Sequence, residues 1–248
     1  MVPALEAILA KSKNLVFFGG AGVSTESGIP DFRSVDGLYH QKFRYPPEVM
    51  LSHSFYETHT AEFFDFYRNK LIVHGAKPNA AHLRLAKLER QGICKAVVTQ
   101  NIDGLHQAAG SRTVYELHGS TLRNYCTRCG KFYPVEFIEQ AAGQGDGIPR
   151  CTECGGIVKP DVVLYEEGLD EETMENAMRA IAAADTLIVG GTSLAVYPSA
   201  GLLRYFRGDE LVVINKQPTP ADYMATLLLN QPIGQALQEE TGVKYHGE

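Results

Sequence analysis

The sequence lacks the features that define secreted and membrane-embedded proteins. It has five cysteines in 248 residues, too few for a disulfide-stabilised scaffold. No segment approaches the roughly 18 uninterrupted apolar residues of a transmembrane helix, so no membrane association is expected. The first residues lack a basic region followed by an apolar stretch, so we expect no secretory signal.

An excess of positive charge is also missing. Acidic residues outnumber basic ones by 29 to 23, which gives a formal net charge of −6 and a pI near 5.8. Because binding to phosphate backbones needs clustered positive charge, no nucleic-acid partner is expected. The balance fits a soluble cytoplasmic enzyme, and the length allows one large domain with or without a small one.

A glycine-rich run after the first apolar segment predicts a phosphate-binding turn. Residues 14–18 are strand-like, Gly19-Gly20-Ala21-Gly22 follows, and the next stretch is compatible with a helix. Glycines let a ligand approach the backbone, and a helix N-terminus supplies free N–H groups. The oxidoreductase fingerprint is absent, because Thr25 replaces its third glycine and Lys42 stands where an acidic residue would bind ribose. The run favours a dinucleotide site and weakens a hydride-transfer function; a ligand-free glycine turn is the alternative.

Two Cys-x-x-Cys pairs predict one zinc site. Cys126 and Cys129 form the first pair, and Cys151 and Cys154 follow after 21 residues. Four thiolates fill the tetrahedral shell of zinc and leave no position for a reactive water, so a structural role is expected. A thioredoxin-like redox pair is the alternative. The fifth cysteine, Cys94, lies in a strand-like run and is expected to be a buried apolar side chain.

Apolar periodicity predicts strands that alternate with helices. Strands are expected over 15–18, 95–99, 113–117, 186–189 and 211–214, and helices over 1–13, 55–73, 79–91, 174–184 and 232–241. The expected fold class is α/β: a Rossmann-like doubly wound parallel sheet with a smaller lobe made of a zinc-binding module and a helical module. The large domain is expected over 1–35, 75–121 and 169–248, the helical part of the small domain over 36–74, and the zinc-ribbon part over 122–168.

Polar or glycine clusters follow the predicted strands. They begin at residues 19, 100, 118, 190 and 215. Because the carboxyl ends of parallel strands meet at one edge, where open α/β sheets bind ligands, these clusters predict one site there.

Several motifs stand in the order in which one enzyme family carries them. They are Gly-Ala-Gly-Val-Ser at 20–24, Gly-Ile-Pro-Asp-Phe-Arg at 28–33, Thr-Gln-Asn-Ile-Asp at 99–103, His-Gly at 118–119, the paired cysteines, Gly-Thr-Ser at 191–193 and Ile-Asn at 214–215. The chain resembles the sirtuins, the NAD-dependent protein-lysine deacylases, and its short termini resemble compact bacterial members. The resemblance implies NAD, one structural zinc ion, acylated-lysine proteins or peptides as substrates, and a monomer.

The resemblance also implies a role for each matched residue. The catalytic residues would be His118, as general base, and Asn101. The cofactor-binding residues would be Gly20, Ala21, Gly22, Thr25, Asp31, Phe32, Arg33, Gln100, Asn101, Ile102, Asp103, Gly191, Thr192, Ser193, Asn215 and Lys216. The substrate-binding residues would be Val162, Val163, Tyr165, Glu166, Phe64 and Tyr67.

The implied reaction transfers an acyl group to ADP-ribose. The acyl-lysine carbonyl oxygen attacks the anomeric carbon of the nicotinamide ribose, and nicotinamide leaves. If its pKa stays near 6.5, His118 is suited to removing a ribose hydroxyl proton at neutral pH. The products would be free lysine, nicotinamide and O-acetyl-ADP-ribose. Two other functions stay open: ADP-ribosyl transfer or NAD hydrolysis at the same site, and a zinc-ribbon interaction module without catalysis.

The chain departs from the sirtuin pattern at two places. Sirtuins commonly carry Val-x-Phe-Gly-Glu on the substrate loop, where this chain has Tyr165 for Phe and Glu166 for Gly. We expect this loop to pair with the substrate backbone as an added strand, provided that φ of Glu166 is not positive, and its charge to favour basic neighbours of the target lysine. Phe64 and Tyr67 replace the Tyr-x-x-Arg pair of members that prefer acidic acyl groups, so uncharged acyl chains are expected.

Overall fold

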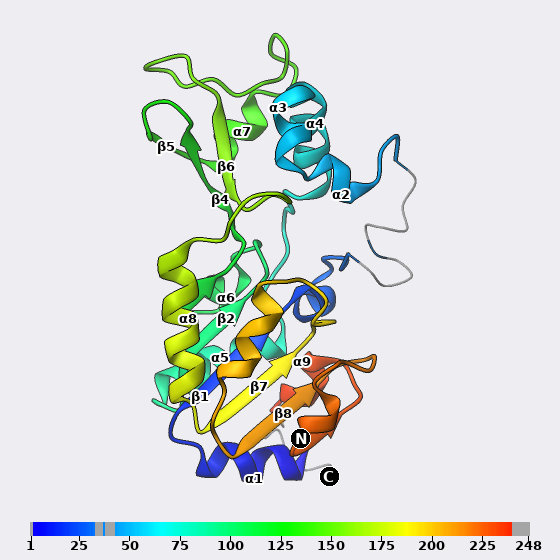
Figure 1. The fold of residues 1–248 in the computed structure, drawn as a ribbon, viewed down its shortest axis with the longest axis vertical. Coiled ribbons are helices and arrows are strands. Elements are labelled where there is room, and N and C mark those ends of the chain that lie inside the picture. Colours follow the sequence, from blue (N-terminus) through cyan, green and yellow to red (C-terminus); the bar gives the residue numbers. More distant parts are fainter. Residues whose placement is uncertain (1, 33–36, 38–42, 240–248) are drawn as a thin grey trace, which may run out of the picture.

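The computed structural model describes residues 2–32, 37 and 43–239. A parallel sheet of six strands forms the centre of its larger lobe, and Figure 1 shows how the sheet lies below the smaller lobe. The strand order is β3-β2-β1-β7-β8-β9. The strands are β1 (Leu15–Gly19), β2 (Cys94–Thr99), β3 (Val114–Glu116), β7 (Thr186–Gly190), β8 (Glu210–Ile214) and β9 (Leu227–Leu229). Strands β1 and β7 are buried along their whole length, which is why they are continuous apolar runs. The edge strand β9 was not predicted.

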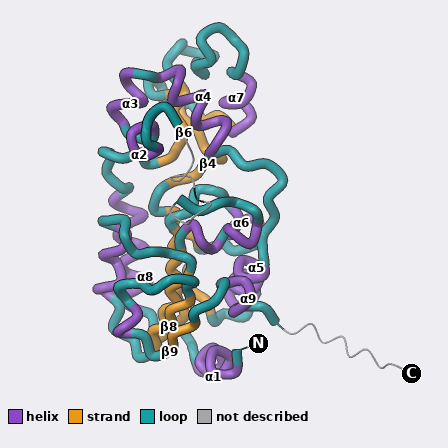
Figure 2. The backbone as a smooth tube through the Cα atoms, turned by 90° about the vertical axis from the view of Figure 1, so that its right-hand side faces the viewer, coloured by secondary structure: helices purple, strands orange, loops and turns teal. Residues whose placement is uncertain are grey.

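Helices cover both faces of this sheet (Figure 2). Helices α1 (Pro3–Lys11), α5 (Ala80–Arg90) and α9 (Ile233–Leu237) share a core with Phe17 and Val97 on one face. Helix α8 (Glu171–Ala183) and the 3₁₀ helix η4 (Ser199–Tyr205) pack against Val16, Phe18 and Val98 on the other. The doubly wound α/β prediction is therefore confirmed. Cys94 is 2% exposed, as predicted.

The smaller lobe combines a three-stranded antiparallel sheet with short helices. The sheet has the order β5-β4-β6 and contains β4 (Gly119–Cys126), β5 (Phe132–Pro134) and β6 (Val158–Val162). Its helices are α2 (Pro47–Met50), α3 (His53–Thr58), α4 (Thr60–Lys70) and α7 (Val135–Gln140). Phe63 and Tyr67 of α4 lie in the same hydrophobic core as Cys126 and Val158, so the helical and zinc-ribbon segments are built around one interior.

Two helix predictions were wrong. The helix expected over 55–73 breaks at His59, whose φ of −131° and ψ of 45° are not helical. On either side Thr58 and Thr60 donate their hydroxyls to backbone carbonyls of the preceding turn, a competition that bends helices. The stretch after the glycine run forms two single-turn 3₁₀ helices, Ala21–Val23 and Thr25–Ser27, in place of an α-helix. The second one ends at Gly28, which adopts φ +85°.

The remaining elements are small. A four-residue helix α6 (Leu105–Ala108) follows β2, and a further 3₁₀ helix covers Asp222–Met224. Within the described ranges, no helix is long and apolar enough to cross a membrane.

Candidate active site

A cleft of about 840 Å³ lies at the carboxyl ends of the parallel strands, with walls from both lobes. The predicted site residues that line it are Ala21, Gly22, Thr25, Asp31, Phe32, Gln100, Asn101, Ile102, Asp103, His118, Val162, Val163, Tyr165, Glu166, Gly191, Thr192, Ser193, Asn215 and Lys216. Gly20, Phe64 and Tyr67 are not among its lining residues, and Arg33 lies outside the described residues. The structure thus brings segments from five strand ends together.

The glycine run is shaped by contact between two loops. Gly22 donates its N–H to the carbonyl of Gly191 at 2.8 Å, which joins the end of β1 to the end of β7. A Cβ on Gly22 would stand 2.8 Å from the Cα of Gly191, so only glycine permits this approach. Gly20 lies behind the cleft surface, where a Cβ would meet Gln100 Oε1 at 2.8 Å.

A hydrogen-bonded network joins three polar side chains in the cleft. Ser24 Oγ donates to Asp103 Oδ2 at 2.6 Å and accepts from Asn101 Nδ2 at 3.0 Å. The other Asp103 oxygen accepts the N–H of Leu105 at 2.9 Å at the start of α6. Sequence reasoning had predicted Asn101 and Asp103 but missed Ser24, although Ser24 ends the glycine motif.

His118 has one fixed and one available ring nitrogen. Its Nδ1 lies 3.0 Å from the carbonyl oxygen of Gln100. A carbonyl only accepts, so Nδ1 carries the proton and Nε2 is left as a proton acceptor. Burial lowers the pKa of His118 below 6.5, while the hydrogen bond to Gln100 opposes this change. A pKa lowered from 6.5 leaves the imidazole of His118 in its neutral form at pH 7, as a base requires.

Gln100 connects this histidine to the loop after β7. Its Nε2 donates to Ser199 Oγ at 2.8 Å, and its Oε1 accepts from Thr192 Oγ1 at 3.1 Å. Ser199 is completely buried and was not predicted, because nothing in its local sequence marks it as a partner of Gln100.

Three further predicted residues have local partners at the cleft. Thr25 donates its hydroxyl to the carbonyl of Gly22 at 3.0 Å, and Asn215 donates its amide to the carbonyl of Gln217 at 2.8 Å. Val163 donates its N–H to the carbonyl of His118 at 3.0 Å, which ties the predicted substrate loop to the histidine.

The predicted substrate loop differs from expectation at Glu166. Its φ is +77°, so the condition attached to its role as an added strand is not met. Tyr165, its neighbour, uses its N–H and carbonyl to pair with Leu51 and His53 at 2.9 and 3.0 Å. At this position the loop already has a strand-like partner in the helical segment.

Phe64 and Tyr67 lie in the core of the smaller lobe. Both are 0% exposed, and burial raises the pKa of Tyr67. They pack with Phe63 in edge and stacked ring contacts. Lys70 and Leu71, at the end of α4, line the cleft instead.

The four paired cysteines form a zinc site. Their sulfur atoms all lie within 4.8 Å of one another, with Cys126 and Cys154 at 3.4 Å and Cys129 and Cys151 at 3.6 Å. Zn–S bonds of about 2.3 Å in a tetrahedron give sulfur separations of about 3.8 Å, so the set fits one zinc ion. The Tyr133 hydroxyl donates to Cys151 Sγ at 3.1 Å and supports this ligand from outside the tetrahedron.

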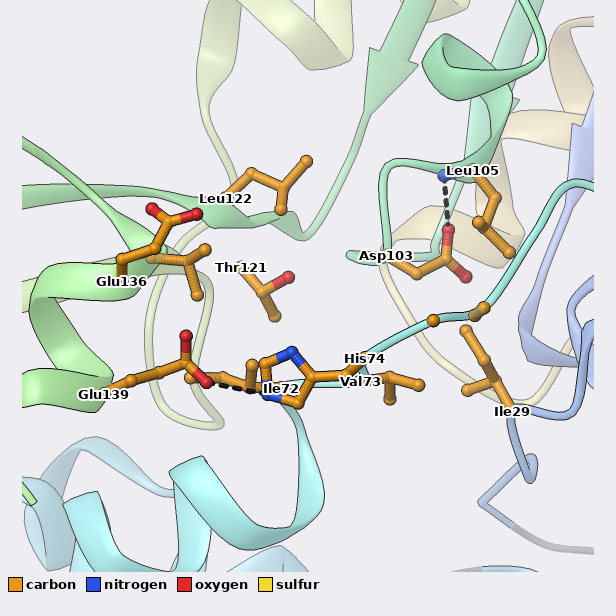
Figure 3. Close-up of a pocket in the computed structure, with 13 residues that line it drawn as sticks. Ile29, Ile72, Val73, His74, Asp103, Leu105, Thr121, Leu122, Glu136 and Glu139 are labelled. Atoms are coloured by element: carbon orange, nitrogen blue, oxygen red, sulfur yellow. Dashed lines mark hydrogen bonds and ion pairs between the residues drawn. The ribbon is translucent and has the colours of Figure 1, made fainter.

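A second cavity of about 210 Å³ adjoins the cleft (Figure 3). Ile29 and Asp103 line both spaces. On the far side of the second cavity, His74 Nε2 lies 2.7 Å from Glu139 Oε1, which joins the segment after α4 to helix α7.

Comparison with known proteins identifies the family. Residues 20–198 match the model of the Sir2 family, and the chain belongs to that family. An NAD-dependent protein deacetylase of Clostridium acetobutylicum is 61% identical over 236 residues, covering 94% of this chain and 95% of the relative.

Two solved structures extend the likeness to ligand complexes. A Sir2 variant with deacetylated p53 peptide and 3′-O-acetyl ADP ribose has a TM-score of 0.85 at 38% identity, covering 94% of each chain. A Sir2Tm complex with a propionylated peptide has a TM-score of 0.83 at 38% identity, also covering 94% of each chain.

Proposed function

We propose that this chain is an NAD-dependent protein-lysine deacylase that transfers the acyl group of an acylated lysine to ADP-ribose and releases nicotinamide. The observation that carries the proposal is that one cleft contains the glycine turns, a histidine with a free Nε2 and the predicted substrate loop. The deacetylase relative and the two complexes support the same activity.

In this proposal the larger lobe holds NAD. The turns at Ala21–Gly22 and Gly191–Ser193 bind the pyrophosphate and nearby ribose through backbone N–H groups and hydroxyls. Thr25, Asp31, Phe32, Arg33 and Ile102 complete the cofactor site, with Gly20 supporting it from behind, and Asn215 and Lys216 face the adenosine end. Bound NAD supplies the anomeric carbon from which nicotinamide leaves. The close approach of the two glycine turns supports this placement, because glycines let the backbone come near a pyrophosphate.

Asn101 and Asp103 define the nicotinamide end of the site. The Ser24 bridge fixes both side chains, so they need no rearrangement when the ligand arrives. Asn101 is 7% exposed, which keeps its amide away from bulk water.

His118 acts as the general base. Gln100 holds the Nδ1 proton, so Nε2 accepts the proton of a ribose hydroxyl. The lowered pKa keeps the imidazole neutral at pH 7 and ready to accept.

The acylated peptide binds along the loop at Val162, Val163, Tyr165 and Glu166. Phe64 and Tyr67 support that wall from the core without reaching the cleft. With no arginine at the Tyr67 position, a carboxylate on the acyl chain lacks a bidentate partner, so uncharged acyl groups are preferred.

We further propose a monomer that acts in the cytoplasm on acylated-lysine proteins, without nucleic acid or membrane as partner. Residues 1–35, 75–121 and 169–248 would form the large NAD-binding domain, 36–74 the helical part and 122–168 the zinc-ribbon part of the small one.

Peptide mass and nicotinamide release, followed together, test the proposed activity. An acetyl-lysine peptide should lose its acetyl group only when NAD is present, with one nicotinamide released per acetyl lost. His118→Ala should abolish this reaction, whereas His74→Ala, an exposed histidine outside the cleft, should retain it. Nicotinamide release with the peptide unchanged would instead establish ADP-ribosyl transfer or NAD hydrolysis.

A further inference from the structure

Glu166 adopts a backbone conformation that its side chain disfavours. Its φ of +77° lies in the left-handed region, where a Cβ meets the neighbouring carbonyl. Among the described residues only Leu194 shares this feature outside glycine. Such a conformation persists where surrounding contacts hold it, and it is often found at functional sites.

The Glu166 carboxylate supplies those contacts. Its Oε2 accepts the N–H of Ser54 at 2.9 Å, and its Oε1 accepts the Ser54 hydroxyl at 3.0 Å. Ser54 lies in the first turn of α3, where backbone N–H groups have no partner inside the helix. Both carboxylate oxygens are therefore bound to one residue of the helical segment.

These two hydrogen bonds belong to a series of hydrogen bonds along the substrate loop. Val163 is bonded to the carbonyl of His118, and Tyr165 is bonded to Leu51 and His53 through its backbone. The loop thus spans from the proposed general base to the helical segment. Glu166 holds the end of this segment, where its own left-handed backbone conformation turns the chain away.

The neighbouring Glu167 adds further hydrogen bonds to the loop. It binds His53 Nδ1 at 2.8 Å and Lys159 Nζ at 3.1 Å, and it also accepts the N–H of Leu164. The bond to His53 also reaches α3, whereas the other two hold the loop to β6 and to itself. The Glu166 carboxylate binds the next residue of α3, Ser54, through its own two oxygens.

We propose that Glu166 is a positioning residue for the peptide substrate. By binding Ser54 it holds the substrate loop in a fixed position between His118 and helix α3. The proposal rests on the proposed deacylase function. It assigns the carboxylate a role inside the protein, in place of the expected attraction for basic residues of the peptide.

Four variants distinguish the effect of the Glu166 carboxylate from the effect of its backbone conformation. Glu166→Ala removes both hydrogen bonds, and Glu166→Gln keeps one amide oxygen as an acceptor for Ser54. Glu166→Gly accepts the positive φ without strain, so it tests the carboxylate in a loop that can keep its shape. Glu48→Ala, at an exposed carboxylate on α2 outside the cleft lining, is the matched control.

Steady-state kinetics with an acetyl-lysine peptide give the first readout. We expect Glu166→Ala and Glu166→Gly to raise the peptide KM about tenfold, as the loss of a hydrogen bond to a charged group predicts, with the KM for NAD unchanged. Glu166→Gln should lie between wild type and Glu166→Ala, and Glu48→Ala should match wild type. An unchanged peptide KM in Glu166→Gly, or an equal rise in the KM for NAD, would overturn the proposal.

Hydrogen exchange of the loop gives a second readout that needs no turnover. Amides of residues 162–168 should exchange faster in Glu166→Ala and Glu166→Gly than in wild type, while those of β1 and β7 stay unchanged. Equal exchange rates in all variants would contradict a role of the Glu166–Ser54 hydrogen bonds in holding the loop, even if the kinetics changed. If wild type fails to turn over NAD with the peptide, the proposed function fails, and the exchange experiment still decides whether Glu166 positions the loop.

Discussion

His118 illustrates how a single side chain acquires its chemistry from its surroundings. The Gln100 carbonyl occupies one ring nitrogen, and burial shifts the protonation equilibrium toward the neutral form. A lowered pKa means that the base form is complete at lower pH than for a free histidine. Burial thus disfavours the charged imidazolium and favours the neutral imidazole, which can accept a proton.

The pH dependence of turnover should follow this shift. We expect kcat/KM for the peptide to rise as the imidazole loses its proton, to be half-maximal below pH 6.5 and to be level at neutral pH. Measurement from pH 5 to 8.5, with NAD binding followed in parallel, checks this expectation. A half-maximal point above pH 7 would mean that another group limits the reaction.

At the residue scale, the sequence was most informative where a motif is contiguous. The place of Asn101, Asp103 and His118 in the cleft could be predicted because each follows a strand. Ser24 and Ser199 could not, because their roles arise from partners far away in the chain. The left-handed φ of Glu166 was also unpredictable, because its compensating bond with Ser54 exists only in the folded protein.

At the scale of elements, the long apolar strands were predicted to within a residue or two. Strands β1, β2, β7 and β8 consist mostly of buried apolar residues, so their pattern is unambiguous. The short strand β9 has only three residues, too few for a periodic signal. The break at His59 depends on hydroxyl bonds to the backbone, which apolar periodicity does not report.

Helices α5 and α6 meet through two buried histidines, and this contact predicts acid sensitivity. The rings of His82 and His106 lie 4.7 Å apart and are 0% and 1% exposed. Burial lowers the pKa of His82 to about 4, against the attraction of Asp103, and that of His106 to about 3. Both are neutral in the folded protein and take up protons on unfolding below the ordinary pKa of 6.5.

The free energy of unfolding should therefore fall as the pH drops from 7.5 to 5.5. Linkage predicts a loss of about 1.4 kcal/mol for each of the two histidines over this range. His106→Leu should reduce the loss, because it removes one of the two titrating groups. The substitution breaks no side-chain hydrogen bond, since both ring nitrogens of His106 lack a partner in the described structure. Urea unfolding at the two pH values measures this, with the exposed His74→Leu as control; an equal loss in wild type and His106→Leu would show that His106 does not contribute.

At the scale of the whole molecule, we expect the smaller lobe to depend on zinc more than the larger one does. Cys126 and Cys151 belong to the same buried cluster as Phe63, Phe64 and Tyr67, so the metal site and the helical segment share one interior. The six-stranded sheet has separate cores on its two faces. Because zinc binding contributes directly to folding in such sites, its loss should act on one lobe.

Hydrogen exchange after zinc removal tests this asymmetry. With a zinc chelator, amides of residues 50–72 and 126–164 should exchange faster together, whereas those of β1, β2 and β7 should keep their protection. Peptide turnover should fall at the same time, because the substrate loop is bonded to the helical segment. Added zinc should restore both properties. Faster exchange confined to 126–158 would show that the helical segment is stable without the metal, and faster exchange throughout the sheet would show that the two lobes unfold as one unit.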